Sequence, residues 1–288
     1  MEDRVTRRAF MGSLAGLALM PATRAALQGQ APLQVAGIDH VGIRVSDLQQ
    51  STEFYGRLFG AEVLRSPKPI IAHPTSVPSP HNWLRLGRSY LALSLASREN
   101  GRPSIDHYCL AVRGIDQDGL ARQLDGLNRQ YADASGADVW ARDPAGYIIQ
   151  ITPDPEGYWT RLNSMAGAVR VADLEAAKRK PAFRPLRIAH ISLAVSTLED
   201  AAAYYRKLLG DAAVGQSVRN FRAGPALLML ADATAGEHVC IGVADFDPVA
   251  AAKTLEEVGI TAIAPHDENV VEFKDPDGIA VQISGAVA

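Results

Sequence analysis

The 288-residue sequence lacks the features that mark several common classes of protein. Its 29 basic residues do not exceed its 32 acidic ones, so the net charge of -3 gives no reason to expect a nucleic-acid partner. The apolar run from Met11 to Met20 is too short for a permanent membrane span, which needs about 20 residues. Cysteine is nearly absent: Cys109 and Cys240 could join only if their Cα atoms came within about 7 Å, and we expect two free, pocket-facing thiols.

Residues 1–31 differ from the rest of the chain. A charged segment with Arg7 and Arg8, a short apolar run and an alanine-rich end are typical of a secretory signal, and the paired arginines resemble the twin-arginine type. We therefore expect a mature chain that begins near Ala26 and functions in the periplasm or outside the cell, with no membrane segment left. Because this route exports folded proteins, it favours a bound cofactor. A plain cytosolic tail is the alternative.

One strand–helix unit occurs repeatedly. Arg187–Gly210 begins with alternating side chains, continues with the predicted capping box Ser196-x-x-Glu199, and ends with an amphipathic helix. Gly37–Gly60 repeats this pattern, with His40 at the place of His190 and Ser46-x-x-Gln49 at the place of the box. Two further units begin at Ile105 and Glu237. Four such units, each followed by about three strands, predict an α+β chain with two domains.

The expected boundaries follow from proline-rich segments and from the repeats. We predict a first domain over residues 36–153, a connector over residues 154–185 with a charged helix at Val171–Lys180, and a second domain over residues 186–285. A loop from Ser66 to Trp83, with His73 and His81 in it, has the length of a lid, a binding loop or a disordered segment.

Polar side chains recur on one face of the predicted strands. His107 and Gln150 are 43 residues apart, and His238 and Gln282 are 44 residues apart. Two imidazoles and one oxygen donor from three strands can form a facial metal site with open positions. The alternative is a set of buried, hydrogen-bonded histidines inherited from an ancestral repeat. The candidate ligands are His40, His107 and Gln150 in the first half, and His190, His238 and Gln282 in the second.

Several motifs together resemble the vicinal oxygen chelate superfamily of glyoxalases, extradiol dioxygenases and bleomycin-binding proteins. They are Asp39-His40-Val41, the helices that end in Leu-Phe-Gly or Leu-Leu-Gly, and the terminal Asp-Pro-x-Gly-x-x-x-Gln. The resemblance covers about residues 38–152 and 188–284. It implies two cupped, mixed β-sheets built from paired βαβββ modules, with a metal ion in the cup.

The resemblance also implies roles for single residues. Extradiol enzymes hold their metal with His-His-Glu in the second domain, which His190, His238 and Gln282 match except for the carboxylate; the first domain carries a parallel set. His266 is the candidate acid or base. Related folds can pair units across the halves, which would give mixed sites such as His40 with His238. The implied cofactor is a divalent ion, with Fe, Mn, Zn, Ni and Cu as candidates.

Glutamine in place of glutamate leaves a bound divalent ion with more positive charge, so it is a stronger Lewis acid that is held less tightly. We therefore expect an exported metal-dependent enzyme, closest in layout to extradiol dioxygenases, that acts on a small diol, enolate or carboxylate. The alternative is a metal-free binding protein like the bleomycin-resistance proteins. A homodimer is one candidate assembly.

Overall fold

The computed structural model describes residues 32–60, 62–66, 77–99, 101–124, 129–132, 138–154, 169–171, 173–210, 219–263 and 269–285. All of them belong to one compact unit, Ala31–Ala288. The predicted signal segment, most of the proline-rich loop with His73, and the candidate acid or base His266 lie outside the described residues. No helix in the described ranges is both long and apolar enough to cross a membrane.

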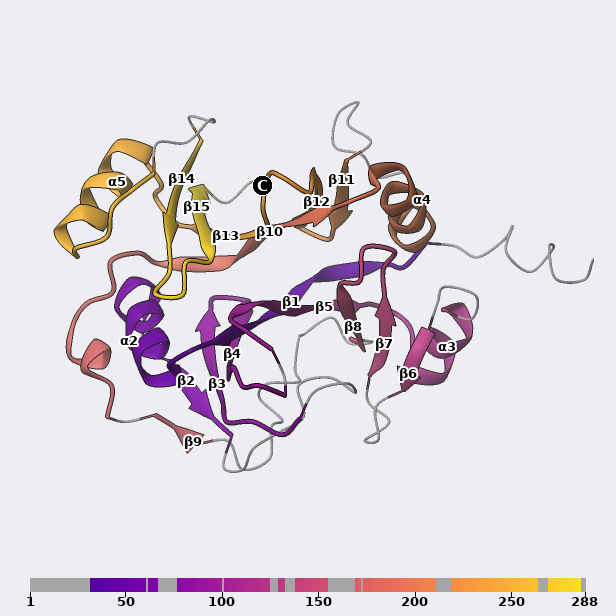
Figure 1. Ribbon diagram of the computed structural model, residues 1–288, viewed down its shortest axis with the longest axis horizontal. Helices are drawn as coiled ribbons and strands as arrows, with labels where there is room; N and C mark the ends of the chain where they lie inside the picture. The colour runs from indigo at the N-terminus through magenta and orange to yellow at the C-terminus, as the bar shows by residue number, and fades with distance from the viewer. Residues whose placement is uncertain are drawn as a thin grey trace, which may run out of the picture. The chain divides into compact units, whose positions relative to one another are not determined.

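The first two units build one mixed sheet (Figure 1). Their first strands, β1 and β5, run antiparallel at its centre, and each is parallel to the last strand of its own unit. The order is β6-β7-β8-β5-β1-β4-β3-β2-β9. The elements are β1 Val35–Val45, α2 Leu48–Phe59, β2 Val63–Arg65, β3 His81–Leu86, β4 Ser89–Leu95, β5 Ser104–Val112, α3 Gln117–Gln123, β6 Arg129–Ala132, β7 Val139–Arg142 and β8 Ile148–Pro153.

The last two units build a second mixed sheet by the same rule. Its central strands β10 and β13 are antiparallel, and the order is β11-β12-β10-β13-β15-β14. The predicted α+β fold of repeated strand–helix units is therefore confirmed. The elements are β10 Pro185–Val195, α4 Leu198–Leu209, β11 Asn220–Ala223, β12 Ala226–Asp232, β13 His238–Val243, α5 Pro248–Glu257, β14 Val270–Lys274 and β15 Ala280–Gly285.

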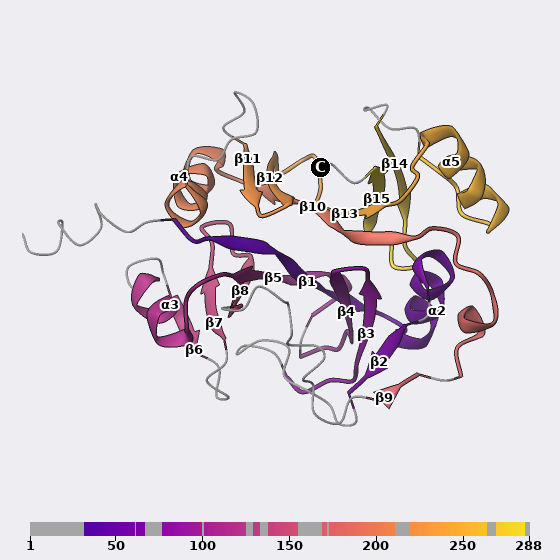
Figure 2. The ribbon, with the colours of Figure 1, turned by 180° about the vertical axis from the view of Figure 1, so that it is seen from behind.

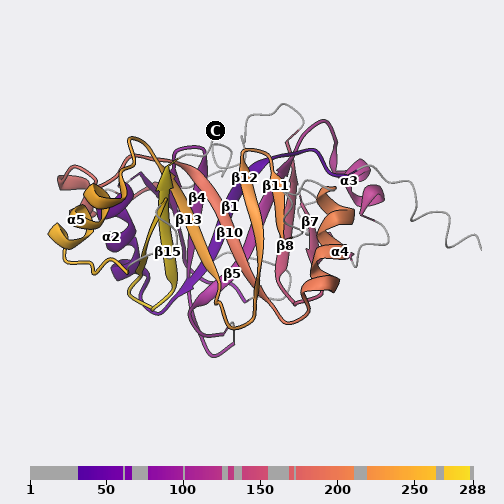
Figure 3. The same ribbon diagram turned by 90° about the horizontal axis from the view of Figure 1, so that it is seen from above.

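The two sheets lie one over the other, with helices at both ends (Figures 1 and 2). Helices α2 and α5 lie at one end and α3 and α4 at the other, while Figure 3 shows β10, β12 and β13 crossing over β1 and β5. Side chains of both sheets belong to a single apolar cluster, which includes Ile38 and Tyr55 of the first half and Ile241 and Phe273 of the second. The two halves therefore share one core.

The connector departs from the sequence prediction. Instead of a helix over Val171–Lys180, the described residues contain a two-residue strand, β9 (Val169–Arg170), and a single 3-10 turn, η2 (Glu175–Lys178). The Glu53 carboxylate of α2 accepts hydrogen bonds from the backbone N–H groups of Glu175 and Ala176. This contact holds the single turn against α2.

Both helices begin one residue later than the predicted capping boxes place them. Helix α2 is capped by Asp47, whose side chain accepts from the backbone N–H of Gln50, and α4 begins after Thr197. Serine and aspartate are both good N-caps, so the Ser46-Asp47 pair allows either start. Ser46 instead donates its backbone N–H to Asp277 of the second half.

Candidate metal site

The histidines of the first half, on the adjacent strands β1 and β5, face each other. The Nε2 atoms of His40 and His107 are 3.1 Å apart, and the two side chains are buried. The His107 ring lies directly over Gly42, its partner across the strand pair; a Cβ atom on Gly42 would collide with the ring atoms Cε1 and Nδ1. Glycine at position 42 is therefore what makes room for this ring.

Each of these imidazoles is bound at its other nitrogen by the aspartate that precedes it. His40 Nδ1 donates to Asp39 at 2.7 Å, and His107 Nδ1 donates to Asp106 at 2.8 Å. Neighbouring residues on a regular strand point to opposite faces, but the β1–β5 register shifts between Ile38 and His40 and between Gly42 and Ile43. These shifts place Asp39 and Asp106 in bulges, and a bulge redirects a side chain.

The aspartates determine the tautomer of both histidines. An ionised carboxylate only accepts hydrogen bonds, so each Nδ1 carries a hydrogen and each neutral ring presents a lone pair at Nε2. Two lone pairs directed at each other across 3.1 Å repel unless a cation lies between them. The cation can be a proton shared by the two rings or a metal ion. This is the carboxylate–histidine arrangement that orients metal ligands.

The separation of the nitrogens fits a shared metal ion. Two imidazoles bound to one ion at about 2.0–2.1 Å have nitrogens roughly 3–3.4 Å apart at the usual coordination angles. Carboxylates also surround the site: Asp39, Asp106 and Asp138 each contact one of the candidate ligands, and the Arg44 guanidinium forms an ion pair with Asp106.

Gln150 lies on β8, next to β5, and is also buried. Its register partner across that pair is Cys109, two residues from His107 on the same face. The amide Nε2 of Gln150 donates to Asp138 Oδ2 at 2.7 Å, which turns the amide oxygen away from that carboxylate. The three predicted ligands of the first half therefore come from three adjacent strands, and the side chain of each is hydrogen-bonded to an aspartate.

The second half repeats the histidine pair in a different environment. His190 and His238 have their Nε2 atoms 3.0 Å apart, and Gln282 hydrogen-bonds to His190 through its side chain. Burial, reinforced by the neighbouring His238, lowers the pKa of His190 to about 4, although the Gln282 contact opposes the shift. Burial also lowers the pKa of His238. Both rings are therefore neutral at pH 7.

The aspartates of the first pair have no counterpart at the second pair among the described residues. The bulge before His190 is present, but it holds Ala189 where the first half has Asp39. Glu237, which precedes His238, instead lies against the Tyr147 hydroxyl and accepts from the backbone N–H of Ile105. One ring can therefore donate from Nε2 to the other in an ordinary neutral hydrogen bond. The second pair is therefore satisfied without a cation.

Aromatic rings enclose the first pair. Trp83 lies edge-on to His40 with ring centroids 5.1 Å apart, Trp140 lies 5.5 Å from His107, and His81 stacks on Trp83. Burial lowers the pKa of His81, and its Nδ1 donates to the carbonyl of Ser79 at 2.8 Å. These rings shield one side of the site from water.

Neither cysteine forms a disulfide, as the sequence predicts, and both side chains are buried. Potential ligand atoms of Cys109, His40 and Asp39 all lie within 4.8 Å of one another. Cys240 donates instead to the Ser284 hydroxyl, and burial raises the pKa of its thiol to about 12. Within the described part of the chain, only the first half thus places a thiol in such a cluster of possible ligands.

The histidines pair within each half. The described contacts join His40 to His107 and His190 to His238, so the mixed alternative of His40 with His238 is not what the structure forms. Five residues that contact the candidate ligands or their partners were not predicted from the sequence: Asp39, Arg44, Asp106, Asp138 and Glu272. One signal was available: an acidic residue directly precedes His40, His107 and His238 in the sequence.

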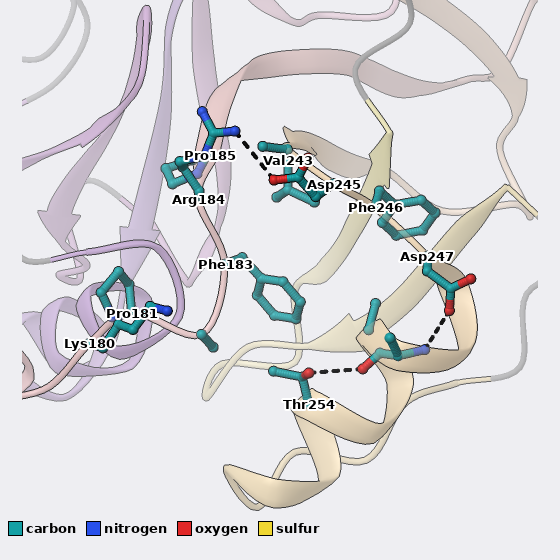
Figure 4. A pocket seen from close by; sticks show the side chains of 14 residues that line it. Lys180, Pro181, Phe183, Arg184, Pro185, Val243, Asp245, Phe246, Asp247 and Thr254 are labelled. Carbon is teal, nitrogen blue, oxygen red and sulfur yellow. Dashed lines mark hydrogen bonds and ion pairs between the residues drawn. The ribbon is translucent and has the colours of Figure 1, made fainter.

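Two cavities lie apart from the histidine rings. One of about 480 Å³, between Lys180–Pro185 and the start of α5, is lined by none of the predicted site residues and is bordered by the Arg184–Asp245 ion pair (Figure 4). Another of about 540 Å³ is lined by Asp106 and Arg44 of the first half and by Glu237 of the second. This second cavity reaches the carboxylate that holds His107, but from the far side of the ring.

Residues 37–160 match the family model described as the Glyoxalase/Bleomycin resistance protein/Dioxygenase superfamily. The matched range coincides with the first of the two regions whose motifs resemble this superfamily. No curated protein was found to match the chain by sequence.

Solved structures with the same fold include two 2,3-dioxygenases. The 2,3-dioxygenase LapB from Pseudomonas sp. KL28 is 13% identical with a TM-score of 0.55, over 90% of this chain and 94% of that one. The homoprotocatechuate 2,3-dioxygenase from Arthrobacter globiformis is 15% identical with a TM-score of 0.55, over 89% and 82%. A Mn(II)-bound glyoxalase from Novosphingobium aromaticivorans is 16% identical with a TM-score of 0.54, over 89% and 84%. These similarities concern the fold.

Proposed function

We propose that this chain, whose residues 37–160 match the glyoxalase and dioxygenase superfamily, is a metal-dependent enzyme acting on a small oxygen-rich substrate. His40, His107 and Gln150 would hold the ion. The observation that carries the proposal is the pair of facing Nε2 atoms, 3.1 Å apart, on two imidazoles that both donate Nδ1–H to aspartates. The layout of paired modules, shared with extradiol dioxygenases, supports a diol, enolate or carboxylate as the substrate.

A divalent ion at this site would supply Lewis-acid polarisation of the oxygens that a chelating substrate presents. The protein residues set the conditions. Asp39 and Asp106 hold both rings in the tautomer that leaves Nε2 free to bind an ion, and Arg44 fixes Asp106 through an ion pair of 2.6 Å. Because all three candidate ligands are uncharged, an anionic substrate would meet no repulsion from them.

The aromatic side chains around the site would contact the substrate and not the ion. The Trp83 and Trp140 rings next to the histidines offer flat apolar surfaces against which a planar ring or enolate can pack. They also exclude water from this side, which strengthens electrostatic interactions within the site. These features favour a planar, doubly oxygenated substrate over an extended polar one.

Metal titration tests the proposal directly. Folded protein, stripped with a chelator, is titrated with Fe(II) under argon and separately with Mn(II) and Zn(II), and uptake is measured by elemental analysis. We expect one equivalent per chain. His107→Ala should weaken binding by at least about 100-fold, since losing a ligand costs more than losing a residue behind it. His238→Ala should leave the stoichiometry unchanged, and the opposite result would assign the ion to the second half.

A second measurement separates the enzyme from a metal-free binding protein. Co(II)-loaded protein is titrated with catechol and with a 2-hydroxy acid while its visible spectrum is recorded. A spectral change that is lost in His107→Ala supports chelation at the ion. Ligand binding of equal strength in stripped and loaded protein would instead support the binding-protein alternative.

We also propose export by the twin-arginine route, on the strength of Arg7, Arg8 and the apolar run that follows them. A fusion of the full chain to a reporter would be followed by cell fractionation. Replacing both arginines by lysine should hold the fusion in the cytoplasm, and unchanged fractionation would contradict the proposal.

A further inference from the structure

Behind each candidate glutamine ligand lies a carboxylate in hydrogen-bond contact with the amide nitrogen. Gln150 Nε2 donates to Asp138 at 2.7 Å, and Gln282 Nε2 donates to Glu272 at 3.0 Å. Asp138 is completely buried and Gln150 nearly so. In both halves, the negative charge that a glutamate ligand would carry is instead on the acidic residue that contacts the glutamine amide.

The two halves reach this contact from different positions. Glu272 is the register partner of Gln282 across β14 and β15. In the first half that partner position holds Trp140, and the carboxylate comes from Asp138, two residues earlier and on the same side. Copying a repeat reproduces a residue at the same position, so duplication alone does not account for an acid that contacts the glutamine from two different positions.

The contact fixes which end of the amide faces the histidines. A carboxylate has no hydrogen to donate, so it selects the NH₂ end of the amide and turns the oxygen away. The second half shows the result, because Gln282 contacts Glu272 at its nitrogen and His190 with the same side chain. A flipped amide would place two oxygens against each other and direct NH₂ toward any cation.

From this geometry we infer that Asp138 is a positioning residue that locks the Gln150 oxygen toward the metal site and supplies its negative charge from behind the ligand. The inference deepens the proposed function and rests on it. It also explains why restoring a glutamate would not help: a carboxylate at position 150 would lie against Asp138, and two buried carboxylates in contact cannot both be ionised.

The experiment compares four forms of the full chain: wild type, Asp138→Asn, Gln150→Glu, and the double variant that exchanges the two groups. Zn(II) affinity is measured by competition with a chromophoric chelator between pH 6 and 8. Asp138→Asn should bind about 10–100-fold more weakly, because asparagine lets the amide of Gln150 turn either way. Gln150→Glu should also bind more weakly than wild type, because a carboxylate at position 150 has no N–H to donate to Asp138.

The double variant is the decisive one. The new amide at position 138 would donate to the new carboxylate at position 150, which restores an ordered pair with the charge on the ligand itself. Zn(II) affinity should then return to within about tenfold of wild type.

Asp154→Asn removes another buried aspartate at the end of β8 and reports the general cost of such a change. In metal-free protein, the Gln150 amide protons should be protected from exchange, and Asp138→Asn should remove that protection.

Two results would overturn the inference: Asp138→Asn binding Zn(II) as tightly as Asp154→Asn, or the double variant binding no better than either single one. Both are distinct from a failure of the proposed function. That failure appears in the wild type itself, as an absence of metal uptake or as uptake that His107→Ala does not reduce, and it would overturn the inference as well.

Discussion

At the scale of single residues, two bulges determine the chemistry of the first histidine pair. Regular alternation would place Asp39 and Asp106 on the face opposite His40 and His107. The register shifts in β1 and β5 place each aspartate against the Nδ1 atom of its histidine instead. Sequence periodicity predicts the face of the sheet on which the histidines and Gln150 lie, but it does not reveal a one-residue shift in the register between two strands.

Gly42 provides a test at this scale. Gly42→Ala places a methyl group in the volume of the His107 ring, so the ring must turn away from Asp106 and from His40. We expect metal affinity to fall by at least about tenfold and the free energy of unfolding by roughly 1–3 kcal/mol. Metal titration and urea denaturation measure the two effects.

The control is the corresponding position of the second half. Ser192, the register partner of His238, already carries a Cβ atom. Ser192→Ala should leave metal uptake unchanged, and equal losses in both variants would show that the effect of Gly42→Ala is general destabilisation.

The thiols give a second prediction. Burial holds the Cys240 thiol in its protonated form, with a pKa of about 12, and the nucleophile in alkylation is the thiolate. Native protein treated with iodoacetamide at pH 8 should therefore remain unmodified at Cys240, whereas protein in urea should be modified fully. Mass spectrometry of the tryptic peptide distinguishes these outcomes, and rapid native labelling would contradict the buried position of this side chain.

At the scale of elements, buried tyrosines connect each half to the other. Tyr55 of α2 donates to Asp275 in the turn of the second half, and Tyr205 of α4 donates to Asp143 in the turn of the first half. Tyr108 of β5 joins the second contact through the Tyr205 hydroxyl at 2.6 Å. Desolvation raises the pKa of both aspartates, although the tyrosine hydrogen bonds oppose the shift.

Adjacent tyrosines of α4 supply a matched pair of variants. Tyr205→Phe removes a hydroxyl that serves both Asp143 and Tyr108, so we expect a loss of about 1–3 kcal/mol in the free energy of unfolding. The Tyr204 hydroxyl is buried without a partner among the described residues, so Tyr204→Phe should be neutral or stabilising. Urea denaturation of both variants checks the difference, and equal losses would refute the role of the hydrogen bonds.

The sequence predicts the elements better than their ends and connections. The amphipathic helices α2 and α4 and the long strands β1 and β10 lie where the repeats place them, because their apolar periodicity is strong. The connector forms a 3-10 turn where the sequence predicts a longer helix. Contacts with other elements decide this feature, as the Glu53 carboxylate does for η2, and such contacts are not encoded locally.

At the scale of the whole molecule, the shared core predicts one cooperative unfolding transition. Apolar side chains of both sheets form one cluster, and the tyrosine–aspartate contacts cross between the halves in both directions. Trp83 and Trp140 lie in the first half and no tryptophan lies in the second, so fluorescence does not report the second half directly, whereas far-UV circular dichroism reports both halves. The two signals should change at the same urea concentration. Separate midpoints would show that the halves unfold independently.

The bulge before His190 has a consequence for protein engineering. Its backbone irregularity matches the one that directs Asp39 onto His40, yet the residue there is Ala189, whose side chain is a single methyl group. The backbone position for one of the two carboxylates of the first pair is therefore already present in the second half. Ala189→Asp is expected to fix the tautomer of His190 and to raise the affinity of this imidazole pair for a divalent ion above that of the wild-type pair.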